Sequence, residues 1–101
     1  MLGPPWKNIY NLSDDQLTDL DEAENLIEMM DLSKAESILL DMKEKSPNCV
    51  PILNVLAHMY GRHLSDFESA IQYYTLVLEI EPDNAWARDE RRKYSRYLSY
   101  D

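Results

Sequence analysis

Residues 70–84, AIQYYTLVLEIEPDN, decide how this chain folds. If the residues up to 80 form a helix, apolar side chains cover almost all sides of it, and Pro82 ends the run. A helix that is apolar almost all round is expected to be buried between neighbouring helices. The stretch therefore predicts a central helix over 66–80, then a turn, then a further helix.

The alanine and the proline of this stretch have counterparts 35 residues earlier. Ala70 and Pro82 correspond to Ala35 and Pro47, and each alanine precedes its proline by 12 residues. A fixed period of this length is the signature of a helical repeat. The small alanine lets paired helices approach closely, and the proline ends the second helix of each pair.

Serine followed three residues later by Glu or Gln marks the expected helix starts. This pattern occurs at 13–16, 33–36 and 65–68 and predicts three capping boxes. The turns at 46–48 and 82–84 each end one helix and cap the next. Together these signals predict five helices, over 14–30, 34–45, 50–62, 66–80 and 85–99, and no strand. An N-terminal extension, 1–12, precedes this helical-repeat domain, 13–101.

With these features the sequence resembles the tetratricopeptide-repeat family, strongly over residues 50–84 and less closely over 16–49. Asp19 and Glu22 depart from the family's large apolar residues, and one extra residue in the turn 61–66 gives a period of 35 instead of 34. The resemblance implies an all-α fold, an α-solenoid of two helix hairpins plus a charged C-terminal capping helix. The apolar residues left to pack this last helix are Trp86, Tyr94, Tyr97 and Leu98. The repeat-packing signature is filled by Ala23, Ala35, Leu39 and Pro47, then by Ala57, Tyr60, Ala70, Tyr74 and Pro82.

The same resemblance implies a concave groove that holds another polypeptide. The first half of the groove would be apolar and acidic, so we expect a peptide or amphipathic helix with some positive charge. Leu20 and Glu24 stand where chaperone-binding members hold a C-terminal carboxylate with Lys and Asn, which argues against that mode. The groove positions carry Leu17, Leu20, Glu24, Ile27 and Glu28, then Pro51, Asn54, His58, Gly61 and Arg62.

The sequence contains no set of residues at a spacing typical of a catalytic or metal-binding site. His58 and His63 are five residues apart, so they are expected to project from different faces of a helix. Cys49 precedes a helix start, where a thiolate would be favoured, but a small buried thiol is the simpler interpretation. We therefore expect a non-catalytic protein with no metal and no cofactor.

The charge and composition exclude further classes of function. The net charge is −9, with eleven acids against three lysines over 13–47, so nucleic acid is a poor partner. The tyrosines of the C-terminal half are interpreted as inter-helix packing instead of a platform for bases. A single cysteine, no signal-peptide pattern and no apolar run near 20 residues indicate a cytoplasmic protein without membrane insertion.

Self-assembly is the alternative to groove binding. Two repeats are fewer than the roughly three that such arrays usually need, so extra burial is required. The apolar segment 6–12 could supply it by packing on its own chain, by filling the groove, or by crossing to a second copy. An acidic front and a basic stretch over 86–100 also favour head-to-tail contact in a homo-oligomer.

Overall fold

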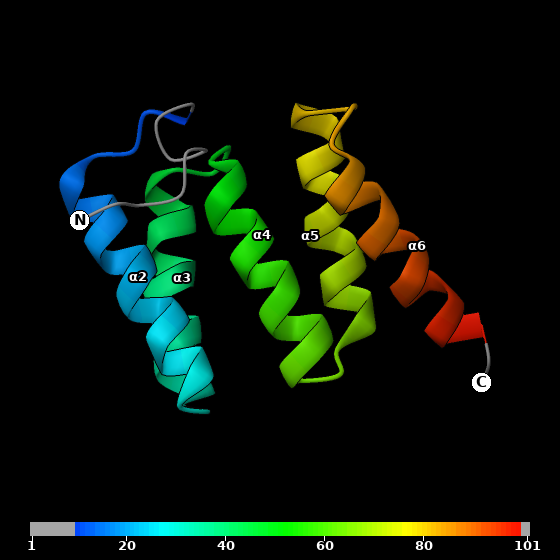
Figure 1. Ribbon diagram of the computed structural model, residues 1–101, viewed down its shortest axis with the longest axis horizontal. Coiled ribbons are helices and arrows are strands. Elements are labelled where there is room, and N and C mark those ends of the chain that lie inside the picture. Colours follow the sequence, from blue (N-terminus) through cyan, green and yellow to red (C-terminus); the bar gives the residue numbers. More distant parts are fainter. Residues whose placement is uncertain (1–9, 100–101) are drawn as a thin grey trace. The chain divides into compact units, whose positions relative to one another are not determined.

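The computed structural model describes residues 10–99 and is all-helical over that range (Figure 1). The expected all-α class is confirmed, and no strand occurs in the described range. The chain divides into two compact units, Met1–Ile52 and Leu53–Asp101. Most of the segment 6–12 lies outside the described residues. The elements are α2 (Asp14–Glu28), α3 (Leu32–Lys45), α4 (Val50–His58), the π-helix η1 (Met59–His63), α5 (Phe67–Ile80) and α6 (Ala85–Ser99).

In the first unit, α2 begins at the expected capping box and packs against α3. The Ser13 hydroxyl accepts from the Gln16 backbone N–H at 3.1 Å, and the Ser13 N–H donates to Gln16 Oε1 at 2.9 Å. Gln16 Nε2 also donates to the Ser46 hydroxyl at 3.0 Å, so the start of α2 is tied to the end of α3. The side chains buried in these two helices are Leu20, Ala23, Leu26 and Ile27, with Ala35, Leu39 and Met42.

The turn between α2 and α3 differs from the prediction. Met30 has a φ of 64°, Asp31 N–H donates to the Leu26 carbonyl at 2.8 Å, and Met30 N–H donates to the Ile27 carbonyl at 3.0 Å. This pattern is a Schellman motif, which ends α2 two residues before the expected residue 30. Because the chain turns at once, α3 starts at Leu32 with Asp31 as its N-cap. The predicted capping box at 33–36 is therefore wrong, since Ser33 lies within the first turn.

In the second unit, α5 starts one residue later than predicted. Asp66 is its N-cap, with Oδ1 accepting from the Ser69 N–H at 3.2 Å and Oδ2 from the Ser69 hydroxyl at 2.7 Å. Ser65 has a φ of 52° and forms the left-handed residue of the preceding turn. The predicted capping box at 65–68 is wrong because Ser65 serves the turn and Asp66 serves the helix.

The helix expected over 50–62 does not stay α-helical. Its last turn widens into η1, and Leu64 N–H donates to the Met59 carbonyl five residues back at 3.2 Å. The widened turn holds one more residue than an α-helical turn would, and it begins before the predicted turn at 61–66.

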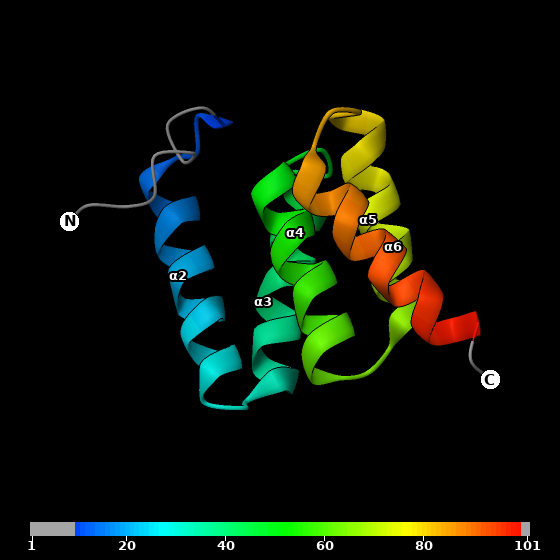
Figure 2. The same cartoon turned by 45° about the vertical axis from the view of Figure 1, so that its right-hand side comes forward.

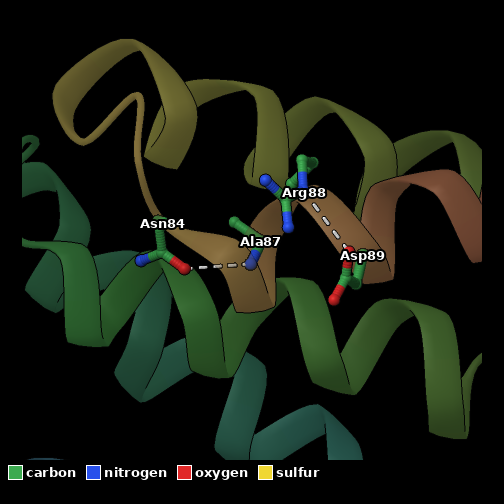
Figure 3. Close-up of polar contacts among 4 residues, drawn as sticks. All are labelled: Asn84, Ala87, Arg88 and Asp89. Atoms are coloured by element: carbon green, nitrogen blue, oxygen red, sulfur yellow. Dashed lines mark hydrogen bonds and ion pairs between the residues drawn. The ribbon is translucent and has the colours of Figure 1, made fainter.

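Helix α6 begins as predicted and lies along α5 in both ribbon views (Figures 1 and 2). Asn84 Oδ1 accepts from the Ala87 N–H at 3.0 Å, and Asn84 Nδ2 donates to Glu81 Oε1 at 2.9 Å. Figure 3 shows this cap beside the ion pair of Arg88 with Asp89. Residues 82–84 therefore end one helix and cap the next.

Burial in α5 is one-sided, contrary to expectation, and α6 buries fewer of its aromatic residues than expected. Helix α5 buries Ala70, Tyr74 and Val77, whereas Leu76 and Ile80 are each 39% exposed. Helix α5 is thus apolar on almost all sides but buried on only one of them. In α6, Tyr94 is buried as expected, but Trp86 is 54% and Tyr97 44% exposed.

Candidate functional site

The groove positions of α2 split between the core and the surface. Glu24 and Glu28 are exposed and Leu17 is half-buried, while Leu20 and Ile27 are buried. The prediction that Leu20 and Ile27 line a groove is corrected, because with Ala23 they form the i, i+3, i+7 stripe by which α2 packs. What α2 presents at these positions is a pair of carboxylates one turn apart.

The groove positions of α4 and η1 split in the same way. Pro51 and Gly61 are buried, Asn54 and His58 are half-buried, and Arg62 is exposed. Asn54, His58 and Arg62 follow one another at four-residue spacing along this segment. The Asn54 Oδ1 atom is buried without a hydrogen-bond partner in the described part of the chain. These three residues belong to the second unit, whereas Glu24 and Glu28 belong to the first.

The signature positions carry the packing. Ala23, Ala35, Leu39, Ala57, Tyr60, Ala70 and Tyr74 are all buried, whereas Pro47 and Pro82 lie exposed in the turns after α3 and α5. The Tyr60 ring stacks on Tyr73, with centroids 5.6 Å apart and planes 1° apart. The residues that the repeat pattern assigns to packing are thus distinct from the polar residues that it assigns to a partner.

The two histidines lie together, contrary to the prediction that they project from different faces. The rings of His58 and His63 meet edge to face with centroids 5.7 Å apart. The π-helical turn explains this, because its five-residue hydrogen-bonding period aligns residues i and i+5. The pKa of His58 lies below its ordinary value, chiefly because the ring is partly buried. The nearby charges of His63, Arg62 and Lys93 lower it further, and the Glu90 carboxylate acts in the opposite direction. Within residues 10–99, no three His, Cys, Asp or Glu side chains gather as metal ligands.

A pocket of about 220 Å³ opens beside η1 in the second unit. It is lined by Gly61, Arg62, Ser65, Phe67, Lys93, Tyr94 and Tyr97. Gly61 and Arg62 were predicted groove positions, whereas Ser65, Phe67 and the three lining residues from α6 were not. The available signal was Gly61, one of two glycines in the chain and set inside an apolar helical pattern, which indicates a close approach by another element.

The side chain that approaches Gly61 is Tyr94, from helix α6. A Cβ atom on Gly61 would overlap Tyr94 Cζ and lie 2.7 Å from Cε2 and 2.8 Å from the hydroxyl oxygen. Glycine is therefore required here for contact between η1 and α6, not for an unusual torsion. The Tyr94 ring also stacks with Phe67 at 5.5 Å and with Tyr74 at 6.4 Å. Its position is fixed from three sides.

The surroundings of Cys49 favour its thiol form over the thiolate. The side chain is half-buried, and burial raises its pKa although a hydrogen bond with the Ile52 backbone acts in the opposite direction.

Comparison of the chain with protein-family models, curated proteins and solved structures found no match. None of the helices in the described range combines the length and the apolar character needed to cross a bilayer. The candidate site is therefore defined by the chain's own residues.

Proposed function

We propose that the chain is a non-catalytic, cytoplasmic protein-interaction module that holds a peptide or amphipathic helix of another polypeptide. In this proposal α2 with α3, and α4–η1 with α5, are two tetratricopeptide-like hairpins, and α6 is the capping helix. The ligand is a polypeptide segment with basic residues and not nucleic acid. The supporting observation is the separation of packing residues from polar surface residues at the positions of each repeat.

The acidic pair on α2 supports a binding role because it works against helix stability. Glu24 and Glu28 are like charges at i, i+4, a spacing that destabilises a helix. Glu28 also lies in the last turn of α2, where no basic residue accompanies it and where the helix dipole disfavours a negative charge. The exposed Glu28 carboxylate at this helix end fits a surface that attracts a cationic partner.

The test is the double variant Glu24→Lys/Glu28→Lys. Partners captured by the wild-type chain from a lysate of source cells are identified by mass spectrometry, and the purified candidate is then titrated against each variant by calorimetry. We expect the double variant to bind about tenfold or more weakly, because two attractive charges become repulsive. We also expect its stability to be close to that of the wild type, because like charges remain at i, i+4 while a cation at position 28 suits the helix end, so lost binding would not reflect lost folding.

A matched control keeps the total charge change the same. Asp41→Lys/Glu44→Lys reverses two exposed carboxylates on α3, outside the predicted groove positions, and breaks the exposed pair of Asp41 with Lys45. The control is expected to retain the partner. Equal loss of affinity in both double variants would show that overall charge, and not the α2 surface, holds the ligand.

Self-assembly as a structural subunit is the second candidate. It is favoured by the exposed apolar residues Leu76, Ile80 and Trp86 of the second unit. Light scattering of the wild-type chain separates the two functions. A stable dimer or larger species with no captured polypeptide would replace the adaptor proposal with the subunit proposal.

A further inference from the structure

The pocket beside η1 combines two cationic side chains with an aromatic wall. Arg62 and Lys93 supply the positive charge, and Phe67, Tyr94 and Tyr97 supply the rings. A volume of about 220 Å³ suits one or two amino-acid side chains and is small for a cofactor. All of its lining residues belong to the second unit.

The aromatic wall is rigid because its rings contact one another. Phe67 lies 5.2 Å from Tyr97 and 5.5 Å from Tyr94, and Tyr94 meets Tyr97 edge to face at 5.7 Å. Tyr94 is buried, whereas Tyr97 remains 44% exposed. The wall thus leaves one partly open ring edge on which an apolar side chain can pack.

Lys93 and Arg62 differ in how many of their hydrogen-bond donors remain for a ligand. The Lys93 ammonium lies 3.1 Å from Glu90 Oε1 and 4.8 Å from the Tyr94 ring centroid, so one of its three donors is engaged. Burial acts against the charge, but Glu90 and the tyrosines Tyr94 and Tyr97 together raise the pKa of Lys93. Arg62 is exposed at the pocket and carries a planar set of donors that matches a carboxylate.

The backbone around the pocket is also unusual. A π-helical turn carries Arg62, and Ser65 holds a left-handed φ of 52° at the pocket edge. Asp66 N–H closes this turn by donating to the Tyr60 carbonyl at 2.8 Å. Widened helical turns and strained non-glycine residues occur preferentially at functional sites.

We propose that this pocket binds the acidic side chain of an internal peptide segment, with a neighbouring apolar residue of that segment packed against Tyr97. Arg62 and a free donor of Lys93 hold the carboxylate in charge-assisted hydrogen bonds. The site goes beyond the interaction surface on α2, because its ligand is acidic and its residues lie in the other unit. It stands whether or not α2 binds a basic segment.

A nucleic-acid ligand fits the pocket less well. Stacking of bases requires open ring faces, whereas Phe67 and Tyr94 stack on each other with planes 19° apart. The chain's net charge of −9 also repels a long phosphate backbone, while a short peptide is affected chiefly by the local cations. Charge complementarity and the size of the pocket both favour an acidic peptide.

The test uses the full chain labelled with nitrogen-15 and the capped peptide acetyl-EEFEE-amide. We expect saturable shifts of the backbone amides of residues 61–67 and 93–97. Arg62→Gln should weaken binding about tenfold, because a charge-assisted hydrogen bond is lost. Arg92→Gln is the matched control, since it removes the same charge from an exposed α6 residue outside the pocket lining, and it should bind as the wild type does.

Four further outcomes each overturn the proposal. Equal binding of acetyl-QQFQQ-amide would show an apolar site without charge recognition. Equal weakening by Arg92→Gln would show diffuse attraction to α6. Tighter binding of octauridylate at the same amides would assign the pocket to nucleic acid. Shifts that depend on protein concentration without peptide, and disappear in Arg62→Gln, would make a second copy of this chain the occupant.

The α2 variant keeps the two proposals separate. Glu24→Lys/Glu28→Lys should bind acetyl-EEFEE-amide at residues 61–67 and 93–97 as the wild type does. Failure of the peptide to bind any form of the chain would remove the pocket proposal and leave the α2 surface untouched.

Discussion

Met30 ends α2 in a left-handed conformation that costs any residue with a Cβ atom. Its φ is 64°, its side chain is 60% exposed, and it occupies the position of a Schellman motif where glycine is most common. Met30→Gly should therefore raise the free energy of unfolding by about 0.5–1 kcal/mol, the relief of strain less the added freedom of the unfolded chain. Urea unfolding followed by circular dichroism measures the change.

Met29 is the matched control for that substitution. Its side chain is also exposed to solvent, and its φ of −82° is one that residues with a Cβ atom adopt readily. Met29→Gly should lower the stability by roughly 0.5 kcal/mol, since glycine only adds freedom to the unfolded chain there. Stabilisation by both glycines, or by neither, would contradict the assignment of strain to Met30.

At the scale of elements, the contact of η1 with α6 depends on a missing side chain. Gly61→Ala forces its new methyl group into the Tyr94 ring, which Phe67 and Tyr74 hold in place. We expect a loss of about 1–3 kcal/mol in the free energy of unfolding, the usual cost of overpacking. Thermal and urea unfolding of the variant measure this loss.

A double-mutant cycle separates the clash from other effects of alanine. In a Tyr94→Leu background the overlapping ring atoms are gone, so adding Gly61→Ala should cost little or even stabilise the helix. The same loss in both backgrounds would show that Gly61 is needed for its backbone and not for the approach of α6.

The helices were predictable from sequence, and their exact caps were less so. The start of α2 at Ser13 and the start of α6 at Asn84 follow local rules, because each cap is made by a side chain near its own helix. The starts of α3 and α5 do not, because Met30 and Ser65 adopt left-handed torsions that their residue types disfavour. Both turns are closed by backbone hydrogen bonds, of Asp31 N–H to the Leu26 carbonyl and of Asp66 N–H to the Tyr60 carbonyl, which any non-proline residue can donate.

At the scale of the whole molecule, uneven charge affects stability. Helix α2 places like charges at i, i+4 twice, in Asp15 with Asp19 and in Glu24 with Glu28. Raising sodium chloride from about 10 mM to about 200 mM screens this repulsion, so we expect the melting temperature to rise by a few degrees. Scanning calorimetry over a salt series measures the effect.

A neutral α2 variant tests the cause. Glu24→Gln/Glu28→Gln removes one of the two like-charge pairs of α2, so its melting temperature should depend less steeply on salt. An identical slope would show that salt acts through hydrophobic burial instead of through charge.

The candidate sites show where sequence reasoning stops. Glu24, Glu28 and Arg62 are exposed, and their place in a groove stays a prediction. Leu20 and Ile27 were misplaced, because an apolar residue satisfies a groove and a core equally well in a sequence. The pocket beside η1 was missed because it joins Arg62 to Lys93, Tyr94 and Tyr97 of another helix.

The π-helical turn also bears on how such a chain changes over generations. An α-helix advances about 100° per residue, so one residue inserted into a regular helix rotates every later side chain away from its contacts. A widened turn at η1 takes up one residue locally, and Ala70 and Tyr74 beyond it still face the core. A single-codon insertion at this place can therefore change the surface around Arg62 without any repacking of α5.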